Sequence, residues 1–205
     1  MPPKPVVQSS NYVVGEADGR RERGARNKAA VVSALLDLYQ GGEYQPSAAR
    51  VAEVAGVSER SAFRYFDDME DLANAAITLQ WERIHQHFEG LDGSGTLETR
   101  INAIVDHRLR LLDKVLGTSH AAALVAIRSA TVATALERRR SFLRVQAVNQ
   151  FRPEIDRSPN PAVTARLVDM ALCLETLQYL SNSAGLTKAK MRETLIAALR
   201  ANLER

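Results

Sequence analysis

A run of basic side chains near the start of the chain is the first feature that could bind an anionic partner. The sequence "RRERGARNK" covers residues 20–28 and opposes its cations with a single acid, Glu22. The cations are Arg20, Arg21, Arg23, Arg26 and Lys28. Such side chains could follow DNA phosphates or enter a minor groove. Residues 1–22 contain several Pro and Gly residues and few large apolar groups, which predicts a flexible arm, and a merely solvated leader is the alternative interpretation.

Three helical patterns follow this arm. Apolar residues recur at helical spacing from about residue 26 and stop at a Gly-Gly pair at 41–42. Ser47 can cap a second helix that ends near residue 56, and Ser58 can cap a third that runs to about Phe66. Two short helices separated by about three residues predict a helix-turn-helix, although an ordinary helical hairpin in a bundle would give the same pattern.

Four acids follow the third helix, where a polyanion should repel them. We place them in the first turn of a fourth helix, which extends to about residue 88. Asp68 can cap that helix, and Glu70 and Asp71 lie where carboxylates favour the positive end of the helix dipole. Asp67 has no evident role in this interpretation.

The stretch from residue 26 to about residue 84 resembles the DNA-binding domain of the TetR family of transcriptional regulators. The specific match is "SAARVAEVAGVSERSAFRYFDDMEDL", with its Ala-Gly-Val-Ser turn, its aromatic Phe-Arg-Tyr-Phe close and its acidic-acidic-Leu step. The resemblance implies a homodimer whose two third helices enter successive major grooves of a palindromic operator in double-stranded DNA. It also implies a larger helical domain that binds a small effector.

The resemblance also implies roles for individual residues. Serines at the starts of the second and third helices would meet phosphates, and polar residues of the third helix would face the major groove, with Arg60 favoured for a base contact and Arg64 left open. Phe63 and Met69 stand where the family commonly has Tyr and Lys, so phosphate affinity would shift to other cations. The expected DNA-binding residues are Ser47, Arg50, Ser58, Glu59, Arg60, Ser61, Phe63, Arg64, Tyr65, Arg20, Arg21, Arg23 and Arg26.

The composition narrows the class of protein. The 205 residues carry a formal charge of +3, suit one body or two small domains, and include one cysteine, which excludes an intramolecular disulfide and fits the cytoplasm. The first residues lack the apolar core of a signal peptide, and no apolar run is long enough to span a membrane. We find no phosphate loop, nucleophile elbow or metal-binding helix, so we expect no enzyme and no cofactor.

The remainder of the chain predicts more helices and no strands, so the fold class is all-α. We expect an arm at 1–22, the DNA-binding domain at 23–84 and an effector-binding and dimerisation domain at 85–205. Helical patterns lie at about 97–116, at 119–151 with a break, at 162–182 and at 188–203. By resemblance, the last two would pair with their dimer mates. The alternative is that the apolar stripe of the last one, Met191 to Leu203, belongs to the core of a single protomer.

An effector cavity would combine apolar walls with a few polar groups. Its candidate residues are Trp81, His85, Phe88, His107, Leu111, Leu124, Arg128, Phe142, Gln146 and Cys173. The histidines lack ligand spacing, so we expect no metal site. The densest basic run, "ERRRSFLR" at 137–144, is either a solvated helix face or a mouth that attracts anionic effectors.

These observations favour a dimeric repressor that leaves its operator when a small, largely apolar molecule binds. A non-specific architectural DNA-binding protein and, less favoured, an enzyme with an appended helical head are the alternatives.

Overall fold

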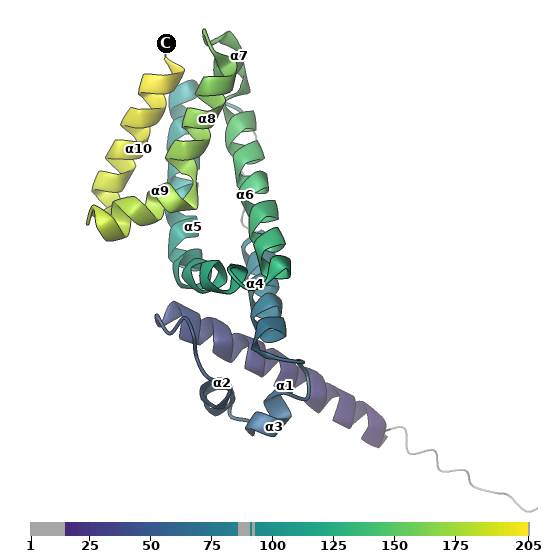
Figure 1. Cartoon of the computed structure of the whole chain (residues 1–205). Helices are drawn as coiled ribbons and strands as arrows, with labels where there is room; N and C mark the ends of the chain where they lie inside the picture. Colours follow the sequence, from purple (N-terminus) through teal and green to yellow (C-terminus); the bar gives the residue numbers. More distant parts are fainter. Residues whose placement is uncertain (1–14, 86–90, 92, 205) are drawn as a thin grey trace, which may run out of the picture.

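The computed structural model describes residues 15–85, 91 and 93–204, and every regular element in that part of the chain is helical (Figure 1). The elements are α1 (Gly15–Gln40), α2 (Ala48–Val54), α3 (Glu59–Ala62), α4 (Met69–His85), α5 (Leu97–Ala126), α6 (Ala130–Gln150), α7 (Arg152–Arg157), α8 (Pro161–Leu172), α9 (Leu174–Gln178), the π-helical turn η1 (Tyr179–Ser183) and α10 (Lys188–Leu203). The expected all-α fold class is confirmed.

The N-terminal helices form a small body around the inner face of α1. Val31, Leu35 and Tyr39 of α1 are buried against Val51 of α2 and Phe66, which follows α3. Figure 1 shows α2 and α3 on one side of α1, with α4 rising from this body toward the long C-terminal helices. The first turn of α4 also belongs to this core. This packing fixes α2 and α3 relative to each other.

The C-terminal body is a bundle built mainly from α5, α6, α8 and α10. Ile101, Ile104 and Val105 of α5 belong to one continuous apolar core with Val168 of α8 and Leu195 of α10. The apolar stripe of α10 is therefore buried within its own chain. For these side chains the alternative, a protomer core stripe, holds, and the pairing of the last two helices with their dimer mates stays a prediction.

A buried ion pair fastens α7 to the start of α5. Arg100 Nη2 lies 2.6 Å from Glu154 Oε1 and its Nη1 lies 2.9 Å from Oε2, while Nη1 also donates to the Gln150 carbonyl at 2.6 Å. Both charged side chains are nearly buried. The Glu154 carboxylate raises the pKa of Arg100, and hydrogen bonds from Arg100 hold the pKa of Glu154 below its usual range.

Four expected boundaries need correction. Residues 15–22, which we expected in a flexible arm, belong to α1, and residues 1–14 lie outside the described part. Helix α3 ends at Ala62 instead of near residue 66. The expected helices at 97–116 and 119–151 do not part at residues 117–118: α5 continues through these residues to Ala126, and the break lies at 127–129. The expected helix at 162–182 divides at Cys173, whose backbone is extended; the Cys173 thiol and the Thr176 hydroxyl both donate to the Met170 carbonyl that the break leaves free.

Candidate functional sites

The starts of α2 and α3 are capped by serine hydroxyls. Ser47 Oγ accepts a hydrogen bond from the Arg50 backbone N–H at 3.2 Å, and Ser58 Oγ accepts one from the Ser61 N–H at 3.2 Å. Gly56 has φ of +67°, a conformation that favours glycine, and it turns the chain between the two helices. The helix-turn-helix that the sequence predicts is therefore present, with both caps as expected.

Helix α3 turns its polar side chains outward. Glu59, Arg60 and Arg64 are exposed, whereas Ala62 and Phe66 are buried in the N-terminal core. The inward Ala62 allows the short helix to lie close to α1. An exposed row of this kind, presented by a rigid body, can enter a major groove.

The aromatic residues that end the helix-turn-helix differ in their contacts. Arg64 stacks over the Tyr65 ring with its guanidinium carbon 4.9 Å from the ring centre, and its Nη2 donates to the Tyr65 hydroxyl at 2.5 Å. The Tyr65 hydroxyl accepts that bond, so its own proton can still be donated to a phosphate. Phe63 is half-buried against the N-terminal core, and Ser61 is engaged with Ser58.

The remaining expected DNA contacts lie on α1 and α2. Arg21, Arg23 and Arg26 are exposed on α1, with Arg26 3.8 Å from Glu22, while the side chain of Arg20 lies outside the described part. Arg50 pairs with Glu53 at 2.8 Å and with Glu43 at 3.4 Å, so a phosphate would compete with two carboxylates for it.

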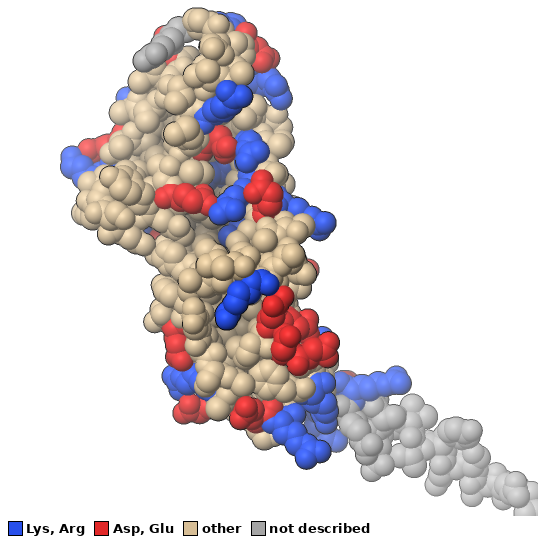
Figure 2. Space-filling model, in the orientation of Figure 1, with Lys and Arg blue, Asp and Glu red and all other residues tan. Residues whose placement is uncertain are grey.

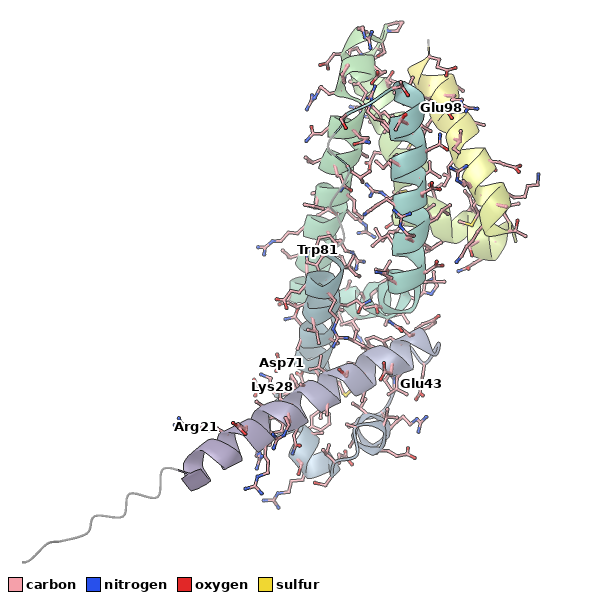
Figure 3. All side chains as sticks on the ribbon, turned by 180° about the vertical axis from the view of Figure 1, so that it is seen from behind. Arg21, Lys28, Glu43, Asp71, Trp81 and Glu98 are labelled. Atoms are coloured by element: carbon pink, nitrogen blue, oxygen red, sulfur yellow. The ribbon has the colours of Figure 1, made fainter. Side chains whose placement is uncertain are left out.

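Basic side chains gather at the end of the molecule that carries α3 and the start of α1. Figure 2 shows them there with acidic side chains beside them, and Figure 3 places Arg21 nearer than Lys28 to the N-terminal end of α1. The Lys28 ammonium also lies 5.2 Å from the centre of the Phe66 ring.

Among the four acids after α3, Asp68 caps the N-terminus of α4. Asp68 Oδ1 accepts hydrogen bonds from the Glu70 and Asp71 backbone N–H groups, each at 2.8 Å. Asp71 Oδ2 accepts from the Asp67 N–H at 3.4 Å. The sequence interpretation of Asp68 as a cap is confirmed, and the acids have a structural role beside the exposed face of α3.

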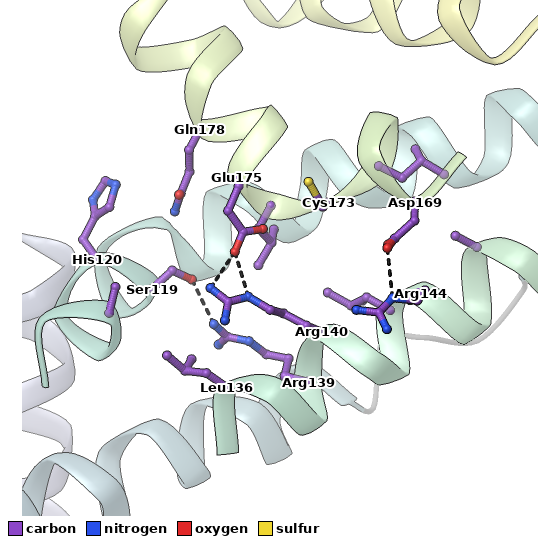
Figure 4. Close-up of a pocket in the computed structure, with 15 residues that line it drawn as sticks. Ser119, His120, Leu136, Arg139, Arg140, Arg144, Asp169, Cys173, Glu175 and Gln178 are labelled. Atoms are coloured by element: carbon purple, nitrogen blue, oxygen red, sulfur yellow. Dashed lines mark hydrogen bonds and ion pairs between the residues drawn. The ribbon is translucent and has the colours of Figure 1, made fainter. Parts of the chain in front are cut away.

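A second candidate site is a cavity of about 340 Å³ between α5, α6, α8 and α9 (Figure 4). This volume is at the lower end of the range for small-molecule pockets, about 300 to 1,000 Å³. The wall combines apolar side chains with several charged side chains, which come from α6, α8 and α9. It consists of Ser119, His120, Ala123, Leu136, Arg139, Arg140, Leu143, Arg144, Ala147, Asp169, Leu172, Cys173, Leu174, Glu175 and Gln178.

Two ion pairs cross from α6 to the opposite wall of this cavity. Arg140 Nη2 lies 2.7 Å from Glu175 Oε1, and Arg144 Nε lies 2.9 Å from Asp169 Oδ2. Both arginines are about half exposed. Figure 4 shows Arg139 pointing toward Ser119, and its Nη2 is 3.4 Å from Ser119 Oγ.

Of the ten residues we expected around an effector, Cys173 lines this cavity. His107 and Leu111 line a separate hollow beside Ile84, and Arg128 lines another near the loop after α1.

The other expected effector residues lie elsewhere. Trp81 packs edge-to-face on Phe142 with 5.7 Å between ring centres, and Gln146 accepts a hydrogen bond from Arg108. Leu124 is half-buried near the end of α5. Phe88 and the side chain of His85 lie outside the described part.

The sequence contained a signal for this cavity that we did not use. Leu136, Arg139, Leu143 and Ala147 recur at spacings of three and four, so they share one face of α6. Of the Arg138–Arg140 run, Arg139 and Arg140 both fit this stripe by spacing, and Arg138 does not. The serine and histidine of α5 had no comparable signal, because their place in the wall depends on how α5 packs against α6.

Helix α5 joins the cavity to the N-terminal body. At Gly117 the helix lies so close to the end of α1 that an added Cβ would stand 2.2 Å from the Tyr39 carbonyl oxygen. One turn later, His120 lines the cavity and its Nδ1 lies 3.2 Å from the hydroxyl of Tyr44, in the loop between α1 and α2. The two rings also meet edge-to-face, with 5.3 Å between their centres.

Two other kinds of site were sought in the described part of the chain. No group of three His, Cys, Asp or Glu side chains there could hold a metal ion. Across the same residues, no helix combines the length and the apolarity needed to cross a membrane.

Comparison with solved structures defines the class of fold. No protein-family model matches the sequence, and no curated protein matches it. Solved structures do match, and several of them are TetR-family transcriptional regulators. The chain has the two-part, all-helical fold of these regulators.

Three of these structures illustrate the likeness. A transcriptional regulator from Rhodococcus sp. Rha1 is 16% identical, with 86% of this chain and 96% of that chain covered and a TM-score of 0.70. A TetR family transcriptional regulator from Pseudomonas syringae pv. tomato is 18% identical, with 91% and 96% covered and a TM-score of 0.59. The transcriptional regulator FadR from Bacillus subtilis, in complex with stearoyl-CoA, is 13% identical, with 85% and 98% covered and a TM-score of 0.58.

Proposed function

We propose that the chain is a ligand-responsive transcriptional regulator of the TetR type, a repressor that acts in the cytoplasm. In this proposal a homodimer holds two α3 helices against a palindromic operator in double-stranded DNA. A small, largely apolar molecule in the C-terminal cavity releases the dimer from that operator. The observation that carries the proposal is the capped helix-turn-helix of α2 and α3, with its outward arginines, in a fold shared over most of its length with transcriptional regulators.

In this proposal α3 reads the bases. A helix fits the major groove, and Arg60 is exposed in the middle of α3, where a guanidinium can donate to guanine O6 and N7. Ser47 and Ser58 lie at helix N-termini whose backbone N–H groups favour phosphate. Glu59 and Tyr65 flank this surface. The Tyr65 hydroxyl is proposed as a further phosphate donor.

The exposed arginines of α1 are proposed to supply phosphate affinity. The triple variant R21Q/R23Q/R26Q should bind operator more weakly and with a shallower salt dependence, because each lost phosphate contact lowers the slope by about 0.9. R110Q, which removes an exposed arginine of α5, is the matched control and should leave the slope unchanged. An unchanged slope in the triple variant would place these arginines away from DNA.

The dimer is proposed to form through the last two helical segments, with the outer face of α8 in the interface. Val163, Leu167 and Met170 share that face, and they are 42%, 37% and 63% exposed in the single chain. Tyr179, just beyond α9, is 61% exposed. A row of large apolar side chains left in water commonly marks a protein interface, and a two-fold axis would place it against itself.

The dimer proposal is tested by light scattering after size-exclusion chromatography. M170E should shift the mass from two chains to one, because it buries an unpaired charge on each side of the axis. I127E is the control, since Ile127 is 80% exposed in the turn between α5 and α6, off the face of α8. A dimeric M170E protein would contradict this interface.

Release of DNA requires that the ligand bind more tightly to one arrangement of the dimer's two DNA-binding domains than to the other. Helix α4 spans both bodies and was our expected lever; the contact of His120 with Tyr44 supplies a second and shorter connection. A shift of α5 on ligand binding would reach the loop that carries Ser47. Coupling of about 1 to 3 kcal/mol would reduce operator affinity about 5- to 150-fold.

Selection of bound fragments from the genome that encodes this protein, followed by footprinting, tests the function. We expect a protected inverted repeat, favoured over other sequences by about 10³-fold or more. Binding without sequence preference would support an architectural DNA-binding protein instead. Absence of any DNA binding would reopen the possibility of an enzyme with a helical head.

A further inference from the structure

Arg139 is a buried cation in the wall of the cavity. Its side chain comes from the inner face of α6 and the residue is only 8% exposed. In the described part of the chain its Nε has no hydrogen-bond partner, and its Nη2 reaches only the Ser119 hydroxyl, at the long distance of 3.4 Å. Burial, with a smaller effect of Arg140, lowers the pKa of Arg139 to about 10, and the Glu175 carboxylate partly opposes this, so the group still carries its charge at neutral pH.

The other charges of the cavity wall pair with each other. Arg140 is engaged by Glu175 and Arg144 by Asp169, and both arginines also lie 3.9 Å from a carboxylate oxygen of Glu137 on the same helix. Among the described residues, no carboxylate forms an ion pair with Arg139. A buried charge costs folding free energy unless it is paired, and such a group commonly indicates a binding role.

A second buried guanidinium stands behind the cavity wall. Arg108 of α5 has no exposed surface, and it donates to three neutral acceptors: the Leu143 carbonyl at 3.0 Å, Gln146 Oε1 at 2.8 Å and His107 Nδ1 at 3.0 Å. Within the described residues no carboxylate pairs with it. Burial lowers the pKa of Arg108 to about 10, and the Asp169 carboxylate of the cavity wall raises it.

The wall also has an apolar part. Leu136, Leu143 and Ala147 of α6 face Leu172 and Leu174 from α8 and α9. We propose that the cavity binds an amphipathic organic anion, whose carboxylate or phosphate group pairs with Arg139 and whose apolar body lies along these leucines. This inference rests on the proposed role of the cavity as the effector site and specifies the chemistry of that effector.

Paired ligands that differ only in charge test the proposal. Octanoate, octyl phosphate, octanamide, octanol and octylamine, together with benzoate and benzamide, are titrated into the full chain by calorimetry. At least one acid should bind about tenfold or more tightly than its neutral counterpart, as expected for a charge-assisted hydrogen bond. The two octyl acids distinguish a carboxylate from a phosphate head group.

Substitutions then locate the preference. R139Q should abolish it, whereas R138Q, which removes the neighbouring exposed arginine of the same helix, should retain it. Equal binding of acids and neutral compounds, no binding by any acid, or an acid preference that survives in R139Q would each overturn the proposal.

Two measurements separate this inference from the proposed function. Without ligand, R139M should raise Tm relative to the wild type, because it removes a buried charge while filling the same space; a lower Tm would mean that the protein itself satisfies Arg139 and would overturn the proposal. R139Q should bind the selected operator as tightly as the wild type but should not respond to the acid. If the protein prefers acids through Arg139 but binds no specific DNA, this inference stands and the proposed regulatory function is refuted.

Discussion

Adding one methyl group at Gly117 should separate the two bodies of the protein. The Cβ of G117A would lie 2.2 Å from the Tyr39 carbonyl oxygen and 2.8 Å from the Gln40 Cα, both backbone atoms that cannot rotate away. Ordinary contact begins at about 3.4 Å, so α1 and α5 must part by at least 3.4 − 2.2 = 1.2 Å at this point. The end of α1 and the loop that follows it would move with this shift.

The magnitude follows from two opposing terms. Overpacking of a close contact costs about 1 to 3 kcal/mol, and replacing Gly by Ala within a helix returns up to about 1 kcal/mol. We therefore expect a net loss of up to about 2 kcal/mol in the free energy of unfolding. For a chain of this length that corresponds to a fall in Tm of up to about 4 to 8 °C.

A second helical glycine supplies the control. A Cβ at Gly24 of α1 would meet the Tyr65 hydroxyl at 3.7 Å, which is ordinary contact, so G24A should gain helix propensity without a clash and raise Tm by about 2 to 4 °C. Calorimetric melting of both variants is the assay, followed by operator affinity, which should fall in G117A because α1 carries the reading helices. A Tm for G117A equal to or above that of G24A would refute the close contact between α1 and α5.

Three further predictions concern single side chains. M69K should tighten operator binding and steepen its salt dependence by about 0.9, and a neutral result would mean that the start of α4 stands away from the phosphates. S58D should keep the cap of α3 and its thermal stability but weaken operator binding, whereas S58A should cost about 1 kcal/mol; equal DNA binding by S58D and the wild type would limit Ser58 to capping. E154Q should lower the free energy of unfolding by about 3 to 5 kcal/mol near neutral pH. Arg100 depresses the pKa of Glu154 in the folded state, so this stabilisation is present above the usual carboxyl pKa and is lost as pH falls through the folded pKa. Urea unfolding measured against pH should show this contribution in the wild type and in the exposed control E98Q. The contribution should be missing in E154Q.

Features set by near neighbours in the sequence were predictable. The caps at Ser47, Ser58 and Asp68 depend on hydrogen bonds to residues two or three positions ahead, so a capping residue before an apolar pattern suffices to place them. The family resemblance covers the same stretch. Most expected sites there are exposed in the structure, whereas Ser61, Phe63 and Tyr65 are half-buried, and whether any of them contacts DNA stays a prediction.

Features set by distant packing were not predictable in the same way. Gly117 falls within α5 because α1 needs close approach at that point, whereas in the sequence a glycine after a helical pattern predicts an end. The cavity wall draws on α5, α6, α8 and α9, and its residues become neighbours only when these helices pack. Within the run Arg138–Arg140, successive side chains point about 100° apart, so the rotation of α6 decides that Arg139 faces inward.

The position of Arg139 also bears on how a ligand signal would travel. In the proposed mechanism the acid group lies against Arg139 and therefore beside Ser119, whose neighbour His120 contacts Tyr44. The preceding turn of α5 is wedged against the end of α1 at Gly117. A ligand that moves α5 by a fraction of an ångström thus acts on two contacts with the N-terminal body within about one helical turn of its own site. Tyr44 does not line the cavity, so Y44F should keep the edge-to-face ring contact, lose the hydrogen bond to His120 and bind octanoate as the wild type does, but release operator less; unchanged release would assign the coupling to α4 instead.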